Sequence, residues 1–244
     1  MENNNSNNVY DNVVQLDDAA ESSRKFIANV FLWMFAALGI SALVVFSFDT
    51  NQAFRNAIID PATNGLTGLG ILALLSPLAF VLTMRFGLNR ISYPILSLIF
   101  VTYAAVTGVS LGLILAMYTL GSVLSVFLTA SVVFGIMAIA GYTTSQDLTK
   151  FGSILIMFLI GIVVASVVNF FLHSTGLQML ISYIGVAVFV GLTAYDVQKL
   201  KNIGAGLEYG DATASKMALM GGLTLYLDFI NLFIMLLRIF GRRR

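Results

Sequence analysis

The sequence predicts an all-α integral membrane protein with seven transmembrane helices. Apolar residues make up 58% of the 244 residues, charged residues only 10%, and the mean hydropathy is +0.91. Soluble domains are usually about 45–50% apolar and about 25% charged. The apolar residues also fall into repeated stretches of about 20, the length that a helix needs to cross roughly 30 Å of hydrocarbon. Because whole stretches are apolar instead of alternating with polar residues, helices are favoured over a β-barrel.

Polar or charged segments separate these stretches and place the spans in order along the chain. We expect spans near residues 26–48, 65–84, 92–117, 121–142, 152–172, 177–198 and 214–238. The third and fourth spans follow each other with almost no loop, so their boundary is expected at Thr119–Gly121. The membrane domain as a whole is predicted to cover residues 26–241.

The two ends of the chain differ from the membrane domain. Residues 1–25 contain six Asn and five acidic residues. Such a segment buries too little apolar surface to compensate for its loss of conformational entropy, so we expect a disordered tail. A secretory signal is not expected, because the basic pair Arg24-Lys25 precedes an apolar stretch that is too long for one. Residues 242–244 form a basic C-terminal end.

Seven spans would place the two termini on opposite sides of the membrane. Basic residues are concentrated on the N-terminal side, at Arg24, Lys25, Arg85, Arg90, Lys150, Lys199, Lys201 and Lys216. The other side holds Arg55, Arg238 and the three terminal arginines. Since cytoplasmic loops are enriched in Lys and Arg, this distribution favours a cytoplasmic N-terminus.

Several classes of function are disfavoured. A net charge of +1 offers no basic face for nucleic acid, and the absence of Cys excludes thiol nucleophiles and disulfides. The sequence contains no GxSxG, HExxH or Walker-type motif, and its one histidine, His173, has no metal-ligand cluster near it in the sequence. We therefore expect neither an enzyme nor a bound cofactor, and we interpret His173 as an interfacial residue at the end of the fifth span.

Small residues indicate how the helices pack. Gly108 and Gly112 form a GxxxG motif beside Thr107 and Ser110, and further glycines recur at 135, 141, 161, 185 and 191. Within a bilayer there is little hydrophobic drive between helices, so small residues that allow close backbone approach supply the packing. A compact bundle is therefore expected.

Charged residues inside apolar spans are the candidate functional residues. Asp228 lies well inside the seventh span, and helical spacing places Gly221, Thr224, Asp228, Asn231 and Met235 on one stripe. A carboxylate at bilayer depth costs about 2.5–3.5 kcal/mol, so it should face the bundle interior and have a partner. The alternative is a purely structural hydrogen bond to the backbone.

Asp196 and Arg85 lie near the ends of spans, where simpler explanations exist. Asp196 closes the sixth span just before Lys199 and Lys201, so an interfacial salt bridge would account for it. Arg85 closes the second span on the same predicted side, where an arginine is usually a topology anchor.

The segment AYDVQKLK, followed by LYLDFINLFIMLLRIFG, resembles the Bax-inhibitor-motif family of membrane proteins. The run RISYPILSLIFVTYAAVTGVSLG resembles the third span of the same family, and the resemblance extends from about Phe26 to Gly241. Its general character is that of a bacterial member, which implies the inner membrane. The resemblance implies a fold in which the last helix is central and wrapped by two three-helix layers. It also implies a pH-sensitive calcium leak, with Ca²⁺ as the transported ion.

The resemblance also assigns roles to three residues. A family pair of aspartates on the sixth and seventh helices shares a hydrogen bond and senses protons, and it matches Asp196 and Asp228. A family arginine at the end of the second helix latches onto the first aspartate, and it matches Arg85. In one respect the chain departs from the pattern, because some members carry an acidic residue within the second span and GLGILALLSPLAFVLTM has none.

The chemistry of such a pair is independent of the resemblance. Two carboxylates held close in a low dielectric resist double ionisation, so the pair is expected to share one proton. Without a proton they repel, unless a cation or Arg85 approaches. Asp196 and Asp228 could be weak Ca²⁺ ligands, because Ca²⁺ takes six to eight oxygens and two aspartates offer at most four. Lipid, Ca²⁺ and protons are therefore the expected partners.

Two other functions remain open at this stage. The chain could be an interaction protein that modulates a membrane protease or a stress- or death-related membrane partner, with any ion leak secondary. It could also be an intramembrane aspartyl protease, since Asp196 and Asp228 form a carboxylate pair. The protease is disfavoured because Leu227 and Phe229 flank the second aspartate, where the usual motif has a glycine.

Overall fold

The structure, a computed structural model, describes residues 4–63, 65–88, 90–207 and 212–244, with side chains from residue 21 onward except at residue 212. Within these ranges the chain forms eight helices, α1 (Asn4–Thr50), α2 (Gln52–Ile58), α3 (Gly68–Gly87), α4 (Tyr93–Leu115), α5 (Leu120–Thr143), α6 (Thr149–Leu172), α7 (Thr175–Ala205) and α8 (Ala212–Phe240). All of these except α2 contain a segment long and apolar enough to cross a membrane, so the prediction of seven spans is confirmed.

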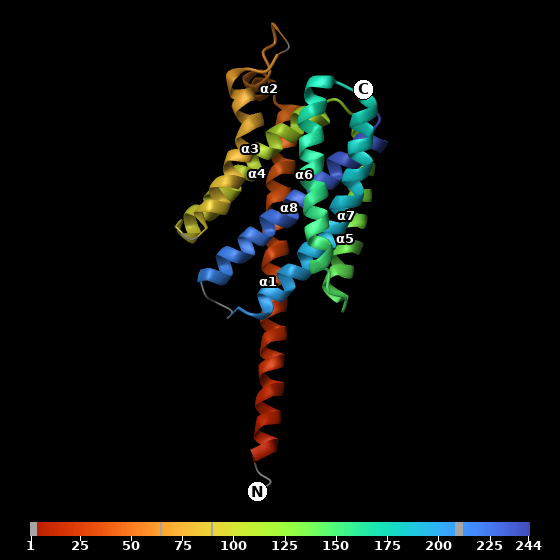
Figure 1. The fold of residues 1–244 in the computed structure, drawn as a ribbon. Helices are drawn as coiled ribbons and strands as arrows, with labels where there is room; N and C mark the ends of the chain where they lie inside the picture. Colours follow the sequence, from red (N-terminus) through yellow and green to blue (C-terminus); the bar gives the residue numbers. More distant parts are fainter. Residues whose placement is uncertain (1–3, 64, 89, 208–211) are drawn as a thin grey trace.

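Helix α1 differs from the prediction at its start. The candidate membrane-spanning segment lies within Glu21–Thr50, but the backbone is already helical from Asn4, through the segment expected to be disordered. Between Asn4 and Leu38 the sequence has neither Gly nor Pro to end a helix, so a helix nucleated in the membrane can continue backward. This first part projects away from the other helices (Figure 1). The packed part begins at Ser23, whose hydroxyl donates to Lys201 O at 2.9 Å.

Helix α2 is a short element that the span map placed inside a polar loop. Asn51 is its N-cap, because Asn51 Oδ1 accepts a hydrogen bond from Phe54 N at 3.1 Å. Its last residue, Ile58, is buried with Phe48 and Val109 in a small apolar cluster. The helix therefore covers the ends of α1 and α4 on the side opposite the N-terminus.

The boundary between the third and fourth spans lies where the sequence predicted it. Helix α4 ends at Leu115 and α5 begins at Leu120. The basic C-terminal end is hydrogen-bonded to this turn, because Thr119 N donates to Arg242 O at 3.0 Å and Arg244 N donates to Met117 O at 3.0 Å. The chain thus ends against the α4–α5 turn, at the opposite end of the bundle from the start of α1 (Figure 1).

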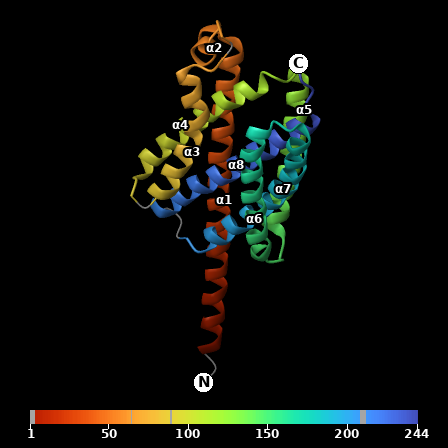
Figure 2. The ribbon, with the colours of Figure 1, turned by 45° about the horizontal axis from the view of Figure 1, so that its top comes forward.

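Helix α8 is the centre of the bundle, as expected. Its residues include several of the most completely buried side chains, Leu219, Leu223, Leu225, Tyr226, Leu232 and Leu237. One layer consists of α1, α3 and α4, in which α4 packs against both of the others. The second layer consists of α5, α6 and α7, in which α7 packs against both of the others. Helix α8 crosses between the layers and contacts α1, α4, α5 and α7 (Figures 1 and 2).

The glycines show which helices approach most closely. A Cβ atom on Gly108 would lie 2.9 Å from Ser41 O, and one on Gly112 would lie 3.0 Å from the Phe48 ring, so the GxxxG motif packs α4 against α1. Gly135 and Gly161, by contrast, face open space. The expectation that all the recurring glycines pack helices together was therefore wrong for these two.

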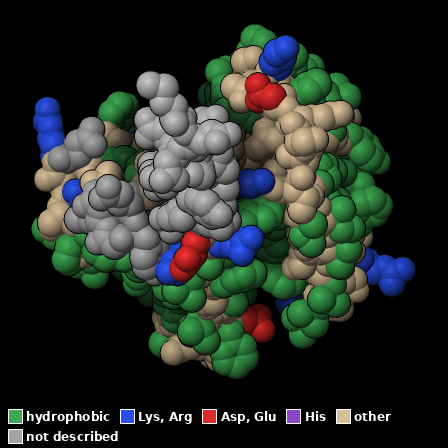
Figure 3. Space-filling model, turned by 90° about the horizontal axis from the view of Figure 1, so that it is seen from below, with side chains coloured by type: hydrophobic (Ala, Val, Ile, Leu, Met, Phe, Trp, Pro, Cys, Tyr) green, Lys and Arg blue, Asp and Glu red, His purple; other side chains and the backbone are tan. Residues whose placement is uncertain are grey.

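The outer surface of the bundle is suited to lipid. Large apolar side chains on every membrane helix are exposed, and α6 is the membrane helix with the fewest buried residues in its apolar segment. Viewed from the end where α1 begins, apolar side chains form most of the periphery, and Lys and Arg side chains lie at several places around this face (Figure 3). The protein is therefore a multi-pass membrane protein.

Candidate functional site

Asp228 lies in the middle of the central helix and is removed from solvent. Only 5% of its surface is exposed, and it is the one carboxyl-bearing side chain among the buried polar residues of the described chain. The neighbouring helix on this side is α7, which packs along α8. The prediction that Asp228 faces the bundle interior is confirmed.

The two ends of the predicted stripe of α8, Gly221 and Met235, contact α7. The two helices run antiparallel, because Gly221 lies against Leu200 at one end and Met235 lies against Gly185 at the other. Between these contacts the Asp228 carboxyl lies beside the Asp196 carboxyl, close enough to interact directly. The antiparallel register thus brings the two aspartates together, and Asp196 is the less buried of the pair.

One oxygen of the pair lacks a hydrogen bond. Asp228 Oδ2 is fully buried and has no hydrogen-bond partner among the described residues, although the Asp196 carboxyl is adjacent. A buried polar atom left unsatisfied costs about 1–3 kcal/mol, and more when it is charged. A proton held between the two carboxyl groups, or a cation, would satisfy this oxygen.

Two basic residues, Arg85 and Lys199, act electrostatically on the aspartate pair. Arg85, in the last turn of α3, is exposed, and it interacts electrostatically with both carboxyl groups. It makes no ion pair with either of them in the part of the chain that the structure describes. Lys199 also contributes electrostatically at Asp196, and its ammonium lies 5.8 Å from the centroid of the Tyr195 ring.

The residues after Asp196 attach the end of α7 to the α5–α6 connection. Gln198 Nε2 donates to Gln146 O at 2.7 Å, and Gln198 Oε1 accepts from Leu148 N at 2.8 Å. Lys201 Nζ donates to Tyr142 O at 2.8 Å. Neither Lys199 nor Lys201 forms an ion pair with Asp196 in the described part of the chain, so the interfacial salt bridge is absent from the structure, and the Lys201 ammonium caps the end of α5.

The two other polar residues of the stripe, Thr224 and Asn231, form no hydrogen bond with Asp196 or Asp228 in the part of the chain that the structure describes. Thr224 Oγ1 donates to Met220 O at 3.1 Å, and Asn231 Nδ2 donates to Leu227 O at 2.8 Å. Each bond returns to the residue's own helix four positions earlier and so does not join α8 to α7. The two residues flank Asp228 along the helix.

A second buried polar cluster was not foreseen from the sequence. Ser41 Oγ donates to Ala104 O at 2.8 Å and accepts from the Tyr226 hydroxyl at 2.7 Å. The Tyr226 and Tyr103 rings meet edge-on with their centroids 5.8 Å apart. Thr107 Oγ1 is buried nearby without a hydrogen-bond partner among the described residues. The sequence feature that could have indicated this cluster is the presence of Tyr103 and Tyr226 within otherwise apolar spans.

His173 lies far from the aspartate pair. It caps the C-terminal end of α6 in the left-handed region, with φ 51°, and its ring is exposed. Its Nδ1 lies 3.2 Å from Phe171 O. Because α6 ends at the opposite end of the bundle from the end of α7, this histidine cannot contact Asp196 or Asp228 (Figure 1).

The donor set limits the chemistry of the site. No group of three or more His, Cys, Asp or Glu side chains that could hold a metal occurs among the described residues. Asp196 and Asp228 supply at most four carboxylate oxygens, whereas Ca²⁺ takes six to eight. The geometry therefore permits a transient, largely hydrated cation or a shared proton.

Comparison with known proteins identifies relatives along nearly the whole chain. The family model described as inhibitor of apoptosis-promoting Bax1 matches residues 23–244. The inner membrane protein YbhL of Escherichia coli is 43% identical over 220 residues, covering 90% of this chain and 92% of its own length. A protein of Borreliella burgdorferi is 42% identical over 221 residues, covering 90% and 93%. The protein RP147 of Rickettsia prowazekii is 37% identical over 224 residues, covering 92% of each. The chain therefore belongs to the Bax inhibitor family of membrane proteins.

Proposed function

We propose that the protein lets Ca²⁺ leak across the membrane and that protonation of Asp196 and Asp228 controls this leak. The observation that supports the proposal is a buried carboxyl oxygen on Asp228, without a hydrogen-bond partner among the described residues, beside a second carboxyl group inside a membrane bundle. Polar and ionisable residues at this depth are costly, and in membrane proteins they mark ion and proton pathways.

The two protonation states of the pair would have different consequences. With one proton, the carboxyl groups hold each other, which fixes α7 against α8. With none, two like charges in a low dielectric repel each other and attract a divalent cation. Deprotonation therefore favours Ca²⁺ entry, so flux should rise with pH. Because waters and backbone carbonyls must complete the coordination shell, binding is weak and passage is favoured over storage.

Arg85 is the proposed latch of the closed state. Helix α3, which carries it, packs mainly against α4 and the short α2, and among the described residues it has no substantial interface with α7. Such a peripheral helix can change position at less cost than the central ones. In the closed state the guanidinium would approach Asp196 and occupy the place that a cation needs. Helix α3 contains no acidic residue, so it offers no carboxylate to an ion that passes along it.

Calcium flux into liposomes tests the proposal directly. The purified chain is reconstituted around a trapped calcium indicator, and initial rates are measured across neutral pH against protein-free liposomes. We expect a slow, pH-dependent flux that requires the protein. If correctly folded and inserted protein carries no flux at any pH, the proposal fails, and an interaction protein that modulates a membrane partner becomes the better explanation.

Arg85→Ala is expected to raise resting flux several-fold, because it removes the positive charge that competes with Ca²⁺ for Asp196. The matched control is Arg90→Ala, which removes an exposed arginine from the same end of the bundle that is not among the charges acting on the pair. Equal flux in the two variants would reduce Arg85 to a topology anchor.

The proposed location is a bacterial inner membrane, with the N-terminus in the cytoplasm. The name of the Escherichia coli relative supports the membrane, and the excess of Lys and Arg on the N-terminal side supports the orientation. Reporter fusions at residues 1 and 244 test it, and a reporter signal from the same side at both ends would contradict it.

A further inference from the structure

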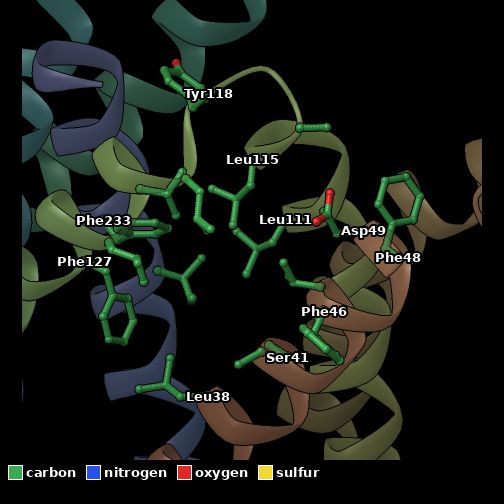
Figure 4. A pocket seen from close by; sticks show the side chains of 18 of the residues that line it. Leu38, Ser41, Phe46, Phe48, Asp49, Leu111, Leu115, Tyr118, Phe127 and Phe233 are labelled. Atoms are coloured by element: carbon green, nitrogen blue, oxygen red, sulfur yellow. The ribbon is translucent and has the colours of Figure 1, made fainter. Parts of the chain in front are cut away.

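A cavity lies beside the central helix α8, and none of the residues that line it belongs to α7, the helix that carries Asp196. Its volume is about 460 Å³, and α1, α4, α5 and α8 line it. Figure 4 shows Phe127 and Phe233 on one side and Phe46 and Asp49 on the other, with Leu111 between them. Nearly all of the lining is apolar, and the volume falls within the range of about 300–1,000 Å³ that is usual for ligand sites.

The depth of the cavity matches one leaflet of a bilayer. Along α1 its lining extends from Leu38, near the middle of the span, to Asp49, near its end. At 1.5 Å per residue, this distance is roughly 16 Å. Half of a hydrocarbon core of roughly 30 Å is about 15 Å. The cavity therefore runs from the membrane interface to the bilayer centre.

The cavity is open sideways toward lipid. Helices α1 and α5 both line it, but they form no interface with each other among the described residues. Lining side chains on both helices are exposed, including Phe46 at 67%, Leu120 at 66% and Leu124 at 55%. Water does not fill an apolar hollow without polar partners, and an empty hollow would forfeit dispersion contacts. Hydrocarbon chains of the bilayer can enter the cavity directly and make dispersion contacts with its apolar side chains.

The mouth of the cavity carries charges suited to a phospholipid headgroup. Arg244 lines the cavity, and the chain around it is held in place by the hydrogen bond from Arg244 N to Met117 O at 3.0 Å. On the opposite side Arg55 donates to Asp49 O at 2.7 Å, which places a second guanidinium beside the rim. Arginine binds phosphate in a bidentate manner. The Asp49 carboxylate offers a partner for an ammonium group.

We propose that this cavity is a phospholipid-binding site, in which an acyl chain lies between α1 and α5 and the phosphate is held at Arg244. The inference is independent of calcium flux, because it rests on the shape, depth and charges of a cavity whose lining includes neither Asp196 nor Asp228. A bound lipid would bridge the two layers where no direct α1–α5 interface exists.

Photolabelling of the full chain tests this site. The protein is reconstituted in liposomes of phosphatidylethanolamine and phosphatidylglycerol that contain a trace of phosphatidylethanolamine with a diazirine halfway along one acyl chain. After irradiation, labelled positions are mapped by mass spectrometry. We expect label to concentrate on the cavity-lining segments of α1 and α5, several-fold above the exposed surface of α6.

Two matched variants distinguish a site from ordinary contact with lipid. Ala42→Phe places a ring in the cavity and should reduce the cavity label several-fold, whereas Ala36→Phe, on an exposed position of the same helix outside the cavity, should not. Arg244→Gln should reduce labelling by the phospholipid but not by a diazirine alkane that has no headgroup. Even labelling over all lipid-facing helices, equal effects of the two Phe variants, or an Arg244→Gln variant that labels like the parent would each overturn the proposal.

Discussion

Asn at either position of the aspartate pair is expected to flatten the pH dependence of calcium flux between about pH 6 and 8. Asn keeps the shape of Asp and its capacity to hydrogen bond, but it removes one ionisable group. In Asp196→Asn or Asp228→Asn, the remaining carboxyl group no longer competes with a like charge for a single proton. The pH-dependent switch between a shared proton and mutual repulsion is therefore lost, and the rise of flux with pH should largely disappear.

The double substitution sharpens this prediction. Residues that act as one unit are strongly non-additive, so Asp196→Asn/Asp228→Asn should flatten the response little further than either single change. Initial flux in indicator-loaded liposomes is measured for the parent, both single variants and the double variant over the same range of pH.

Asp147→Asn is the matched control for these variants. Asp147 lies in the α5–α6 connection, at the same end of the bundle as the C-terminal end of α7 (Figure 1). Hydrogen bonds from the side chain and backbone of Thr149 lower the pKa of Asp147, so its carboxylate remains ionised through neutral pH. The control should therefore keep the parent's pH response. If both single variants at the pair also kept the full response, the proton sensor would have to lie elsewhere, and His173 would be the next residue to test.

Much of the fold follows from hydropathy because a bilayer imposes a length on every span. The tight α4–α5 turn and most ends of the seven spans were predicted within a few residues, but α7 extends seven residues beyond the predicted end at residue 198. Helix α2 was not, because seven residues with one cap carry no periodic signal that separates them from a polar loop. The helical start of α1 was also missed. The composition of residues 4–20 indicates that they cannot form a hydrophobic core, but it does not indicate that the helix of the first span extends back through them.

The candidate site was predictable only in part. An aspartate inside an apolar span identifies itself, because few side chains are so costly there, and Asp228 was found in this way. Its pairing with Asp196 depends on the antiparallel register of α7 and α8, which the spans alone do not set. The hydroxyl cluster at Ser41 and the cavity beside it arise from four helices meeting, so no local pattern in the sequence indicates them.

The same limit applies to the glycines and yields a prediction about stability. Gly135 and Gly141 lie on one helix and look alike in the sequence, yet their surroundings are opposite. A Cβ on Gly141 would contact the backbone of Ala194 on α7, with the Ala194 Cα only 2.7 Å away, whereas one on Gly135 would meet nothing within 4 Å. No rotamer change can relieve a clash with backbone atoms, so the two helices would have to move apart.

Gly141→Ala is therefore expected to destabilise the bundle by about 1–3 kcal/mol, as overpacking of a close-packed interior does. Gly135→Ala should be neutral or stabilising by up to about 1 kcal/mol, because Ala is the better helix former and the site is open. Thermal unfolding of the purified variants in one detergent measures the difference, at roughly 2–4 °C per kcal/mol for a chain of this size.

A second readout connects this packing contact to the aspartate pair. Ala194 lies two residues before Asp196, so displacing α7 at Gly141 should also shift Asp196 relative to Asp228. Gly141→Ala should alter the pH response of calcium flux, while Gly135→Ala should keep the parent's response. Equal melting temperatures for the two variants would show that α5 and α7 do not depend on this close approach. A lower melting temperature with an unchanged pH response would show that the contact stabilises the bundle without positioning Asp196.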